Sequence, residues 1–453
     1  MKSFGRLLRH NQNYRAVWTG QIVSEIGDHF NNIAVMSLAM EHPKPGLVVT
    51  GVFLARAVPM LIAGPVAGVL LDRLDRRRVM IASDLVRAVI ALGFIFCLTH
   101  RDNWLLFALS SLLMFASPFF TSGRSSILPS IATPDELHTA NTMTQTTAWA
   151  SLTLGAFLGA IGVQSGYRIA FTFNAISFLV SAWCVSRLHR PEGFRPAASL
   201  QRTGCRGGTK QEGNTGQSAD SASRCAQVPQ TKAVGGVREY LDGLRYMKSV
   251  PLFAAIAMIS VGWASGGGAA QILFSLFGEK VFRAGPMGIG LIWGCAGVGL
   301  LIGGAIAYRL GPSLTFKQYK TTIAIVYVIH GGAYILFSQM PTIIWACVFI
   351  AISRAAVAIS SVLNVSQLMH HVDDRFRGRL FATLESLTWS TMMLSMMAAG
   401  AASTVYSPRT IGAWAGALSS TTAIFWTWRN LTGKIPEPPI TAEDDTEAVT
   451  HAI

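Results

Sequence analysis

The chain has 453 residues, of which 51% are hydrophobic and only 13% are charged, and its formal net charge is +14. Soluble domains carry about 25% charged residues, so this composition indicates an integral membrane protein rather than a soluble one. The excess of basic residues follows from the orientation of the chain in the membrane, so we expect no nucleic-acid partner.

The chain begins with a basic segment that carries Lys2, Arg6, Arg9 and Arg15. The apolar stretch that follows is too long and too polar for a cleavable signal, so we expect it to be retained as the first membrane span. A helix needs about 20 apolar residues to cross the hydrocarbon. This criterion predicts twelve helical spans, near 16–40, 47–71, 79–99, 104–124, 143–163, 168–188, 251–275, 286–310, 320–338, 342–368, 380–403 and 409–430.

The distribution of Lys and Arg predicts that both ends of the chain lie inside the cell. Cytoplasmic segments of membrane proteins carry the excess of these residues. With the N-terminus inside, most of the 37 Lys and Arg residues fall in cytoplasmic segments. The segments expected outside hold only Lys44, Arg101, Arg168, Lys280, Arg283 and Arg409.

The first predicted span contains a run of polar residues, SEIGDHFNN. On a helix, Gln21, Ser24, Glu25, Asp28 and Asn32 fall within an arc of roughly 100°. Lipid does not accommodate such a stripe, so it faces the interior of the protein or water. Ionisable residues at this depth are candidates for a substrate or proton pathway, and the alternative is a purely structural carboxylate.

Arg56 in the second span is a candidate partner for these carboxylates. Asp28 lies about 18 Å from the outer end of its span and Arg56 about 14 Å from the outer end of the next, at 1.5 Å per residue. We therefore expect Arg56 to neutralise Asp28 or Glu25, which leaves the other carboxylate free to exchange a proton.

Two segments resemble each other in the two halves of the chain. GVLLDRLDRRR (68–78) follows the second span and GAIAYRLGPSL (304–314) follows the eighth, with Gly68, Arg73 and Leu74 repeated as Gly304, Arg309 and Leu310. This weak repeat predicts two six-helix bundles related by duplication, with a cavity between them.

The segment between the halves is rich in Gly, Ser, Thr and Gln, which predicts a disordered cytoplasmic linker. The expected organisation is a first bundle (1–188), a linker (189–236), an amphipathic helix with a second bundle (237–432), and a cytoplasmic tail (433–453).

In the second half, the interior spans carry few polar residues. Gln271, Arg354 and Glu385 are candidates for the pathway, and Arg354 and Glu385 either line the cavity or pair with each other. The aromatic residues Trp263, Trp293 and Trp389 either pack or lie at the membrane interface, or they form a wall for a bulky amphipathic substrate.

The loop GPVAGVLLDRLDRRRVMIASDLVRA resembles the signature loop of the major facilitator superfamily. Together with GQIVSEIGDHFNNIAV, GRSSILPSIATPDELHTAN, EYLDGLRYMKSVP and DRFRGRLFA, it is similar to the drug:proton antiporter subgroup that includes macrolide efflux proteins and the enterobactin exporter. In LGAFLGAIG of span 5, Ala156 stands where the antiporter motif has proline, while Gly155 and Gly159 keep a small face for close helix packing.

This resemblance implies a gate at the cytoplasmic face. Asp72 would dock on the N-terminus of span 11, and Arg73, Arg76 and Arg77 would add ion pairs that break when the gate opens.

The resulting hypothesis is an all-α, twelve-helix exporter of a small amphipathic molecule, driven by proton influx, in a bacterial-type inner membrane and monomeric in its lipid. One alternative is an uncoupled transporter or one for a lipid-like molecule. Another is a membrane enzyme or non-transporting receptor, but the chain has no H-E-x-x-H, G-x-S-x-G or P-loop motif. We expect no cofactor and no metal site.

Overall fold

The computed structural model describes residues 2–99, 103–188, 236–372 and 374–438. Helices make up nearly all of this part of the chain, and none of it forms a strand. The predicted linker and most of the predicted tail lie outside the described residues.

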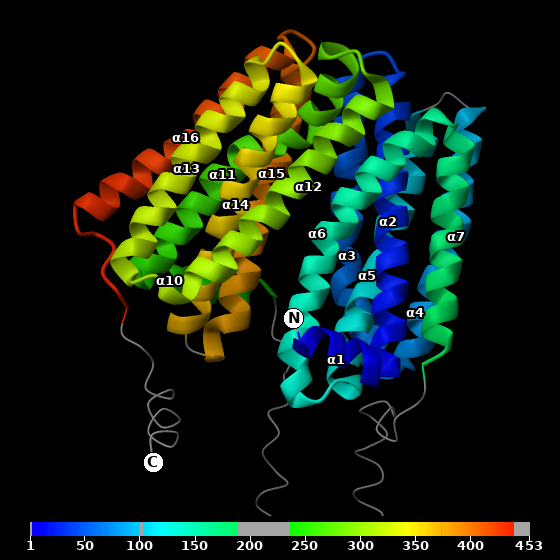
Figure 1. Cartoon of the computed structure of the whole chain (residues 1–453), viewed down its shortest axis with the longest axis horizontal. Coiled ribbons are helices and arrows are strands. Elements are labelled where there is room, and N and C mark those ends of the chain that lie inside the picture. Colours follow the sequence, from blue (N-terminus) through cyan, green and yellow to red (C-terminus); the bar gives the residue numbers. More distant parts are fainter. Residues whose placement is uncertain (1, 100–102, 189–235, 373, 439–453) are drawn as a thin grey trace, which may run out of the picture.

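Two groups of long helices follow one another along the chain (Figure 1). The first group follows a short helix α1 (Lys2–His10), and the second follows α10 (Gly236–Ser249). The first bundle consists of α2 (Gln12–Met40), α3 (Pro45–Arg73), α4 (Arg76–Gly93) continued by η1 (Phe94–Leu98), α5 (Asn103–Ile131), α6 (Pro134–Gln164) and α7 (Tyr167–Ser186). The second bundle consists of α11 (Pro251–Leu276) continued by η2 (Phe277–Val281), α12 (Gly285–Leu310) with η3 (Gly311–Ser313), α13 (Phe316–Gln339), α14 (Ile343–His371), α15 (Asp374–Ala402) and α16 (Pro408–Leu431).

Local sequence signals determine where these helices begin. Pro45 occupies the first turn of α3, where a missing N–H costs nothing. The carboxylate of Asp75 caps α4 by accepting a hydrogen bond from the backbone N–H of Arg77 at 3.0 Å. Gly166, between α6 and α7, has a φ of 126°, which only glycine adopts readily.

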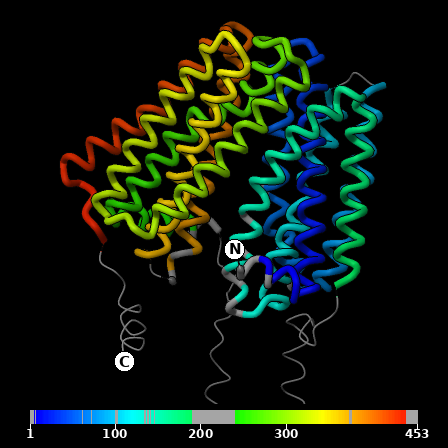
Figure 2. Tube along the Cα trace, in the orientation of Figure 1, coloured from blue at the N-terminus to red at the C-terminus, as the bar shows by residue number. Residues whose placement is uncertain are grey.

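The two bundles meet at one end and diverge at the other. In Figures 1 and 2, both described chain ends lie on the side where the bundles separate. One close contact between the bundles is that of α6 with α12. A Cβ added at Gly290 of α12 would lie 2.6 Å from the carbonyl oxygen of Ala156, so glycine is required for this contact.

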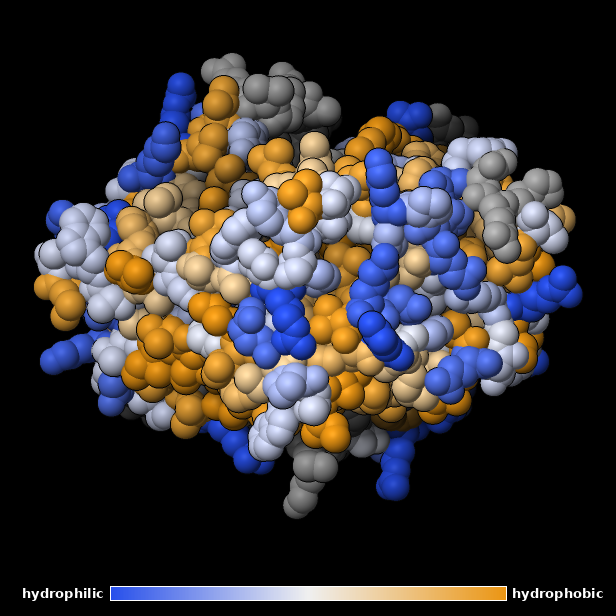
Figure 3. Space-filling model, turned by 90° about the horizontal axis from the view of Figure 1, so that it is seen from above, coloured by the Kyte–Doolittle hydropathy of each residue, from blue (hydrophilic) through white to orange (hydrophobic). Residues whose placement is uncertain are grey.

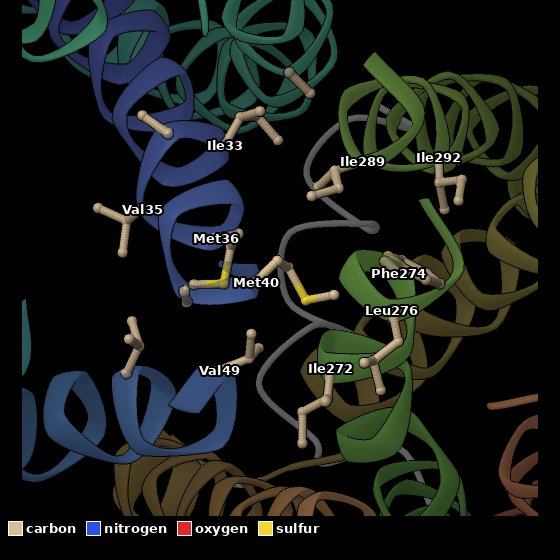
Figure 4. Close-up of a cluster of buried hydrophobic side chains, with 14 of the residues drawn as sticks. Ile33, Val35, Met36, Met40, Val49, Ile272, Phe274, Leu276, Ile289 and Ile292 are labelled. Atoms are coloured by element: carbon tan, nitrogen blue, oxygen red, sulfur yellow. The ribbon is translucent and has the colours of Figure 1, made fainter. Parts of the chain in front are cut away.

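Apolar side chains from both bundles close the end opposite the termini. Figure 4 shows α2 and α3 facing α11 and α12 across this contact. We call these residues the apolar seal: Ile33, Met36, Met40, Val49, Ile272, Leu276 and Ile289, all at most 6% exposed. Seen from this end, a continuous surface of hydrophilic and hydrophobic side chains covers the middle of the molecule (Figure 3).

Each of the twelve stretches predicted from hydropathy contains a long helix, but several helices extend further. The largest difference of consequence is α5, which continues to Ile131 rather than ending near residue 124. By length and composition, nine helices in the described part of the chain are apolar enough to cross a membrane, and α2, α15 and α16 are not among them.

Candidate functional site

Glu25 of α2 is bound by an arginine of α5. Its Oε1 lies 3.2 Å from Nη1 of Arg124 and accepts a hydrogen bond from Nε2 of Gln21 at 2.8 Å. The same Gln21 nitrogen lies 3.3 Å from the carbonyl oxygen of Thr144 on α6. Glu25 therefore connects α2 to α5 directly and to α6 through Gln21.

Asp28, one turn further along α2, is bound by an arginine of α4. Its Oδ2 lies 3.8 Å from Nη1 of Arg87, and Nη2 of Arg87 is bonded to Oδ1 of Asp84 on the same helix. The guanidinium carbon of Arg87 also lies 4.8 Å from the ring centroid of Phe120 and 4.4 Å from that of Phe178. One cation thus holds two carboxylates and packs on two aromatic rings. Asp84 and Arg87 thus form a local pair three residues apart on α4, and Arg87 also reaches Asp28 of α2.

Arg56 forms no ion pair with Glu25 or Asp28, so the predicted direct pairing was wrong, although Arg56 lies within electrostatic range of Asp28. Its Nη1 donates a hydrogen bond of 2.5 Å to Oδ1 of Asn32. Asn32 lies one turn closer to the end of α2 than Asp28, so the depth estimate was in error by about one helical turn, or 5.4 Å.

The three carboxylates of this group differ in how much of the side chain is exposed to solvent. The side chains of Glu25 and Asp28 are 22% and 29% exposed, whereas that of Asp84 is fully buried. Only Glu25 and Asp28 can exchange a proton with water without a change in helix packing. Each has one oxygen without a hydrogen-bond partner among the described residues, namely Oε2 of Glu25 and Oδ1 of Asp28.

The residues predicted to form a gate lie where α3 ends and α4 begins. The side chain of Asp72 is outside the described part of the structure. Arg76 donates to the carbonyl oxygen of Ser126 at 2.8 Å, and Arg77 bonds to that of Ser186. Both carbonyls belong to the first bundle, while Arg73 is exposed. In this arrangement, Arg76 and Arg77 bind backbone carbonyl groups of α5 and α7 and do not contact the second bundle.

The candidates of the second bundle do not form a charged group. Arg354 of α14 is only 8% exposed, and its guanidinium carbon lies 5.2 Å from the ring centroid of Phe274. Glu385 is exposed and forms no ion pair with Arg354, so the pairing alternative is excluded in this arrangement. Gln271 is half-buried on α11. The described residues also contain no cluster of three or more His, Cys, Asp or Glu side chains suited to a metal.

Sequence reasoning missed Arg124 as a member of the site. The span predicted near 104–124 places Arg124 at the very end of its helix, but α5 continues two more turns, to Ile131. The signal that could have found it is the helical phase, since an unbroken α5 places Arg124 on the same face as apolar residues that are buried.

The fold and this charged group define a class of protein, and comparison with known proteins identifies it. The family model of the Major Facilitator Superfamily matches residues 17–384, and the chain belongs to this family. BacE, a proposed bacilysin exporter of Bacillus subtilis (strain 168), is 24% identical over 385 residues, which cover 84% of this chain and 85% of that protein. Macrolide efflux protein A of Streptococcus pyogenes is 25% identical over 126 residues, 27% of this chain and 31% of that protein.

Solved structures share the fold at low sequence identity. The nucleoside transporter NupG aligns with a TM-score of 0.66 at 12% identity, over 91% of this chain and 99% of that chain. An inward-facing bacterial homologue of the iron transporter ferroportin aligns with a TM-score of 0.63 at 16% identity, over 93% and 99%. The chain is therefore a multi-pass membrane transporter with exporters among its relatives, and it is not an enzyme.

Proposed function

We propose that this protein exports a small amphipathic molecule from a bacterial-type cell in exchange for protons. All twelve long helices would span the inner membrane, with both chain ends in the cytoplasm, and the protein would act as a monomer surrounded by lipid. In this orientation the apolar seal is the outer gate, and the side where the bundles diverge opens to the cytoplasm.

The observation that carries the proton coupling is the placement of Glu25 and Asp28. Both carboxylates lie within the helix bundle, are partly exposed, and are held by arginines, Arg124 and Arg87. A proton that binds either carboxylate weakens its ion pair, and departure of the proton restores it. Ionisable groups so placed inside a membrane domain mark ion or substrate pathways.

The route of substrate would run between the bundles, past the polar face of α2. Asn32 and Arg56 lie on this route beyond Asp28, and Gln271, Arg354 and Glu385 would contribute from the second bundle. Asp72, Arg73, Arg76 and Arg77 would form the cytoplasmic gate when the bundles close on that side. The arginine contacts within the first bundle then represent the open state of this gate.

The test is flux through proteoliposomes that contain the full-length protein. A panel of amphipathic compounds, including radiolabelled erythromycin, is measured with and without an imposed pH gradient. We expect accumulation against a gradient that a protonophore abolishes. Asp28→Asn should abolish accumulation and retain downhill exchange, while Arg78→Gln, whose side chain is 80% exposed, should transport normally.

The outcomes distinguish the alternatives. Transport that ignores the pH gradient in the wild-type protein would support an uncoupled transporter instead. Transport by both Asp28→Asn and Glu25→Gln with full gradient dependence would contradict the assignment of the proton to this pair.

A further inference from the structure

The arginines inside the two bundles differ in their interaction partners. In the first bundle Arg87 and Arg124 each contact a carboxylate, and Arg56 donates a hydrogen bond to Asn32. In the second bundle no hydrogen bond or ion pair of Arg354 with a described residue is recorded, although the residue is only 8% exposed. A buried charge without a counter-charge is strongly unfavourable, so its presence requires a compensating interaction.

The neighbours of Arg354 supply part of this compensation. Its guanidinium lies over the face of Phe274, where the ring quadrupole attracts the cation. Trp293 meets the same ring edge to face, with centroids 5.1 Å apart. Arg354 also lies within electrostatic range of Tyr334 and His330.

Two polar groups near Phe274 can each donate a hydrogen bond that no described residue accepts. Nε1 of Trp293 and the hydroxyl of Tyr334 are buried and have no partner among the described residues. The guanidinium brings up to five N–H donors and no acceptor. The ring of His330 does not supply the acceptor, because its two nitrogens are bonded to Ser353 and Ser419 at 2.7 and 3.0 Å.

The position of this cluster relates it to the proposed transport route. Arg354 is the twelfth residue of α14, close to its middle, and Phe274 and Trp293 belong to α11 and α12, which face the first bundle in Figure 4. Trp293 is half-buried, so the cluster is not enclosed on every side, and Trp293 lies on α12 between Gly290 and Gly297, which contact α6 of the first bundle.

We propose that Arg354, with Trp293 and Tyr334, binds a carboxylate or similar anionic group of the transported molecule, whose apolar part packs on Phe274. The substrate class is then an amphiphile with one acidic group. The proposal rests on the proposed export function and adds the charge of the substrate to it. An anion with two oxygens accepts from the guanidinium fork and from the neighbouring donors at once.

The test is equilibrium binding to the purified full-length protein, without any gradient. The probes are N-dansyl-leucine, which carries a carboxylate, and N-dansyl-leucinamide, which does not. Energy transfer from tryptophan to dansyl reports binding. We expect the acid to bind about ten- to one-hundredfold more tightly than the amide, because a hydrogen-bonded charge is involved.

Variants test whether Arg354 causes the preference for the acid over the amide. Arg354→Gln should abolish the preference, Arg354→Lys should retain part of it, and Arg309→Gln at the exposed end of α12 should leave it unchanged. The ligand-free Arg354→Met protein should melt a few degrees higher than wild type, since an unpaired buried charge is removed. A purely structural arginine would produce a lower melting temperature instead.

Several results would overturn the proposal: no binding of the acid at millimolar concentration, equal binding of acid and amide, or an acid preference that survives in Arg354→Gln. The result is independent of proton coupling. Loss of gradient-driven flux with an intact acid preference would contradict the proposed coupling alone, and the reverse result would contradict the anion subsite alone.

Discussion

Arg87 is the most constrained charged residue in the first bundle. It is 2% exposed and simultaneously contacts Asp28, Asp84 and the rings of Phe120 and Phe178. No other side chain has a planar fork that reaches two carboxylates and stacks on aromatic faces. Arg87 therefore couples the proposed proton carrier on α2 to the packing of α4, α5 and α7.

Replacement of Arg87 should destabilise the protein markedly. Arg87→Gln leaves the fully buried Asp84 without its cation, and loss of one partner from a buried ion pair costs about 3–5 kcal/mol. Arg87→Lys should recover less than half of this loss, because an ammonium group cannot bridge both carboxylates. The melting temperature of the purified protein measures the effect, with Arg78→Gln as the exposed control. Equal stability of wild type and Arg87→Gln would show that the bridge is unimportant.

At this scale the residues of the site were predictable, but their partners were not. Glu25 and Asp28 stand out because a helical period places both carboxylates on one face of an apolar span. Which arginine each one contacts depends on the rotation and depth of three other helices. The depth of Arg56 was estimated wrongly by one helical turn, so its partner is Asn32 and not a carboxylate. The end of α5 was predicted too early, so Arg124 was not considered as a partner.

Among the elements, α6 occupies a special position because it packs on both bundles. On one side, Gly155 and Gly159 allow it to approach α2; a Cβ at Gly155 would lie 2.9 Å from the carbonyl oxygen of Ile26. This confirms the predicted small face. On the other side, Ala156 and Ala160 lie against Gly290 of α12. Ala156, where the antiporter motif has proline, thus contributes to the contact between bundles.

The contact of α6 with α12 should control the balance between the two gate states. Gly290→Val forces these helices apart at the end that the apolar seal closes, without affecting either bundle's own core. We expect the seal to open more often, which increases labelling of Met40→Cys by a membrane-impermeant thiol reagent in a background without native cysteines. Gly332→Ala, where an added Cβ has no atom within 4 Å, should not change the labelling. Unchanged labelling in Gly290→Val would contradict this role.

Hydropathy was sufficient to place all twelve long helices within a few residues of their centres. It could not place their ends, because a helix continues into water where its backbone hydrogen bonds and caps allow. The charged residues that end an apolar run, such as Arg124, are not helix breakers. The start of α4 is different, because it can be recognised in the sequence. Asp75 is a polar residue that precedes the helix, and its side chain caps the first turn.

In the whole molecule, the contact between the bundles is largely apolar, with Glu279 near Glu41 and Tyr167 as an exception, whereas the contacts within each bundle are partly ionic. The ion pairs recorded among the described residues all lie within one bundle, as do the side-chain hydrogen bonds, including those of Glu25, Asp28 and Arg56. Between the bundles, the described contacts are those of the apolar seal and of small residues such as Gly400 beside Thr50. Each bundle can therefore move as a rigid unit.

A disulfide that joins the two bundles next to the apolar seal should stop transport. A Cβ built on Gly400 of α15 lies 2.9 Å from Cβ of Thr50 on α3, slightly closer than the roughly 3.5–4.5 Å of disulfides, so a small separation of the helices suffices. The Thr50→Cys/Gly400→Cys protein, otherwise free of cysteine, should lose flux on oxidation and regain it on reduction. Each single variant should be insensitive to the oxidant. Full transport by the cross-linked protein would show that the two helices need not part.

The composition of the apolar seal also determines how temperature acts on this transporter. When the seal parts, Met36, Met40, Ile272 and their neighbours exchange contact with one another for contact with water. Hydration of such surface has little enthalpy near 25 °C and a large heat capacity, so the tendency of these side chains to stay together declines on cooling. The closed side is thus held mainly by the entropy of water, since none of the ion pairs recorded among the described residues joins the two bundles.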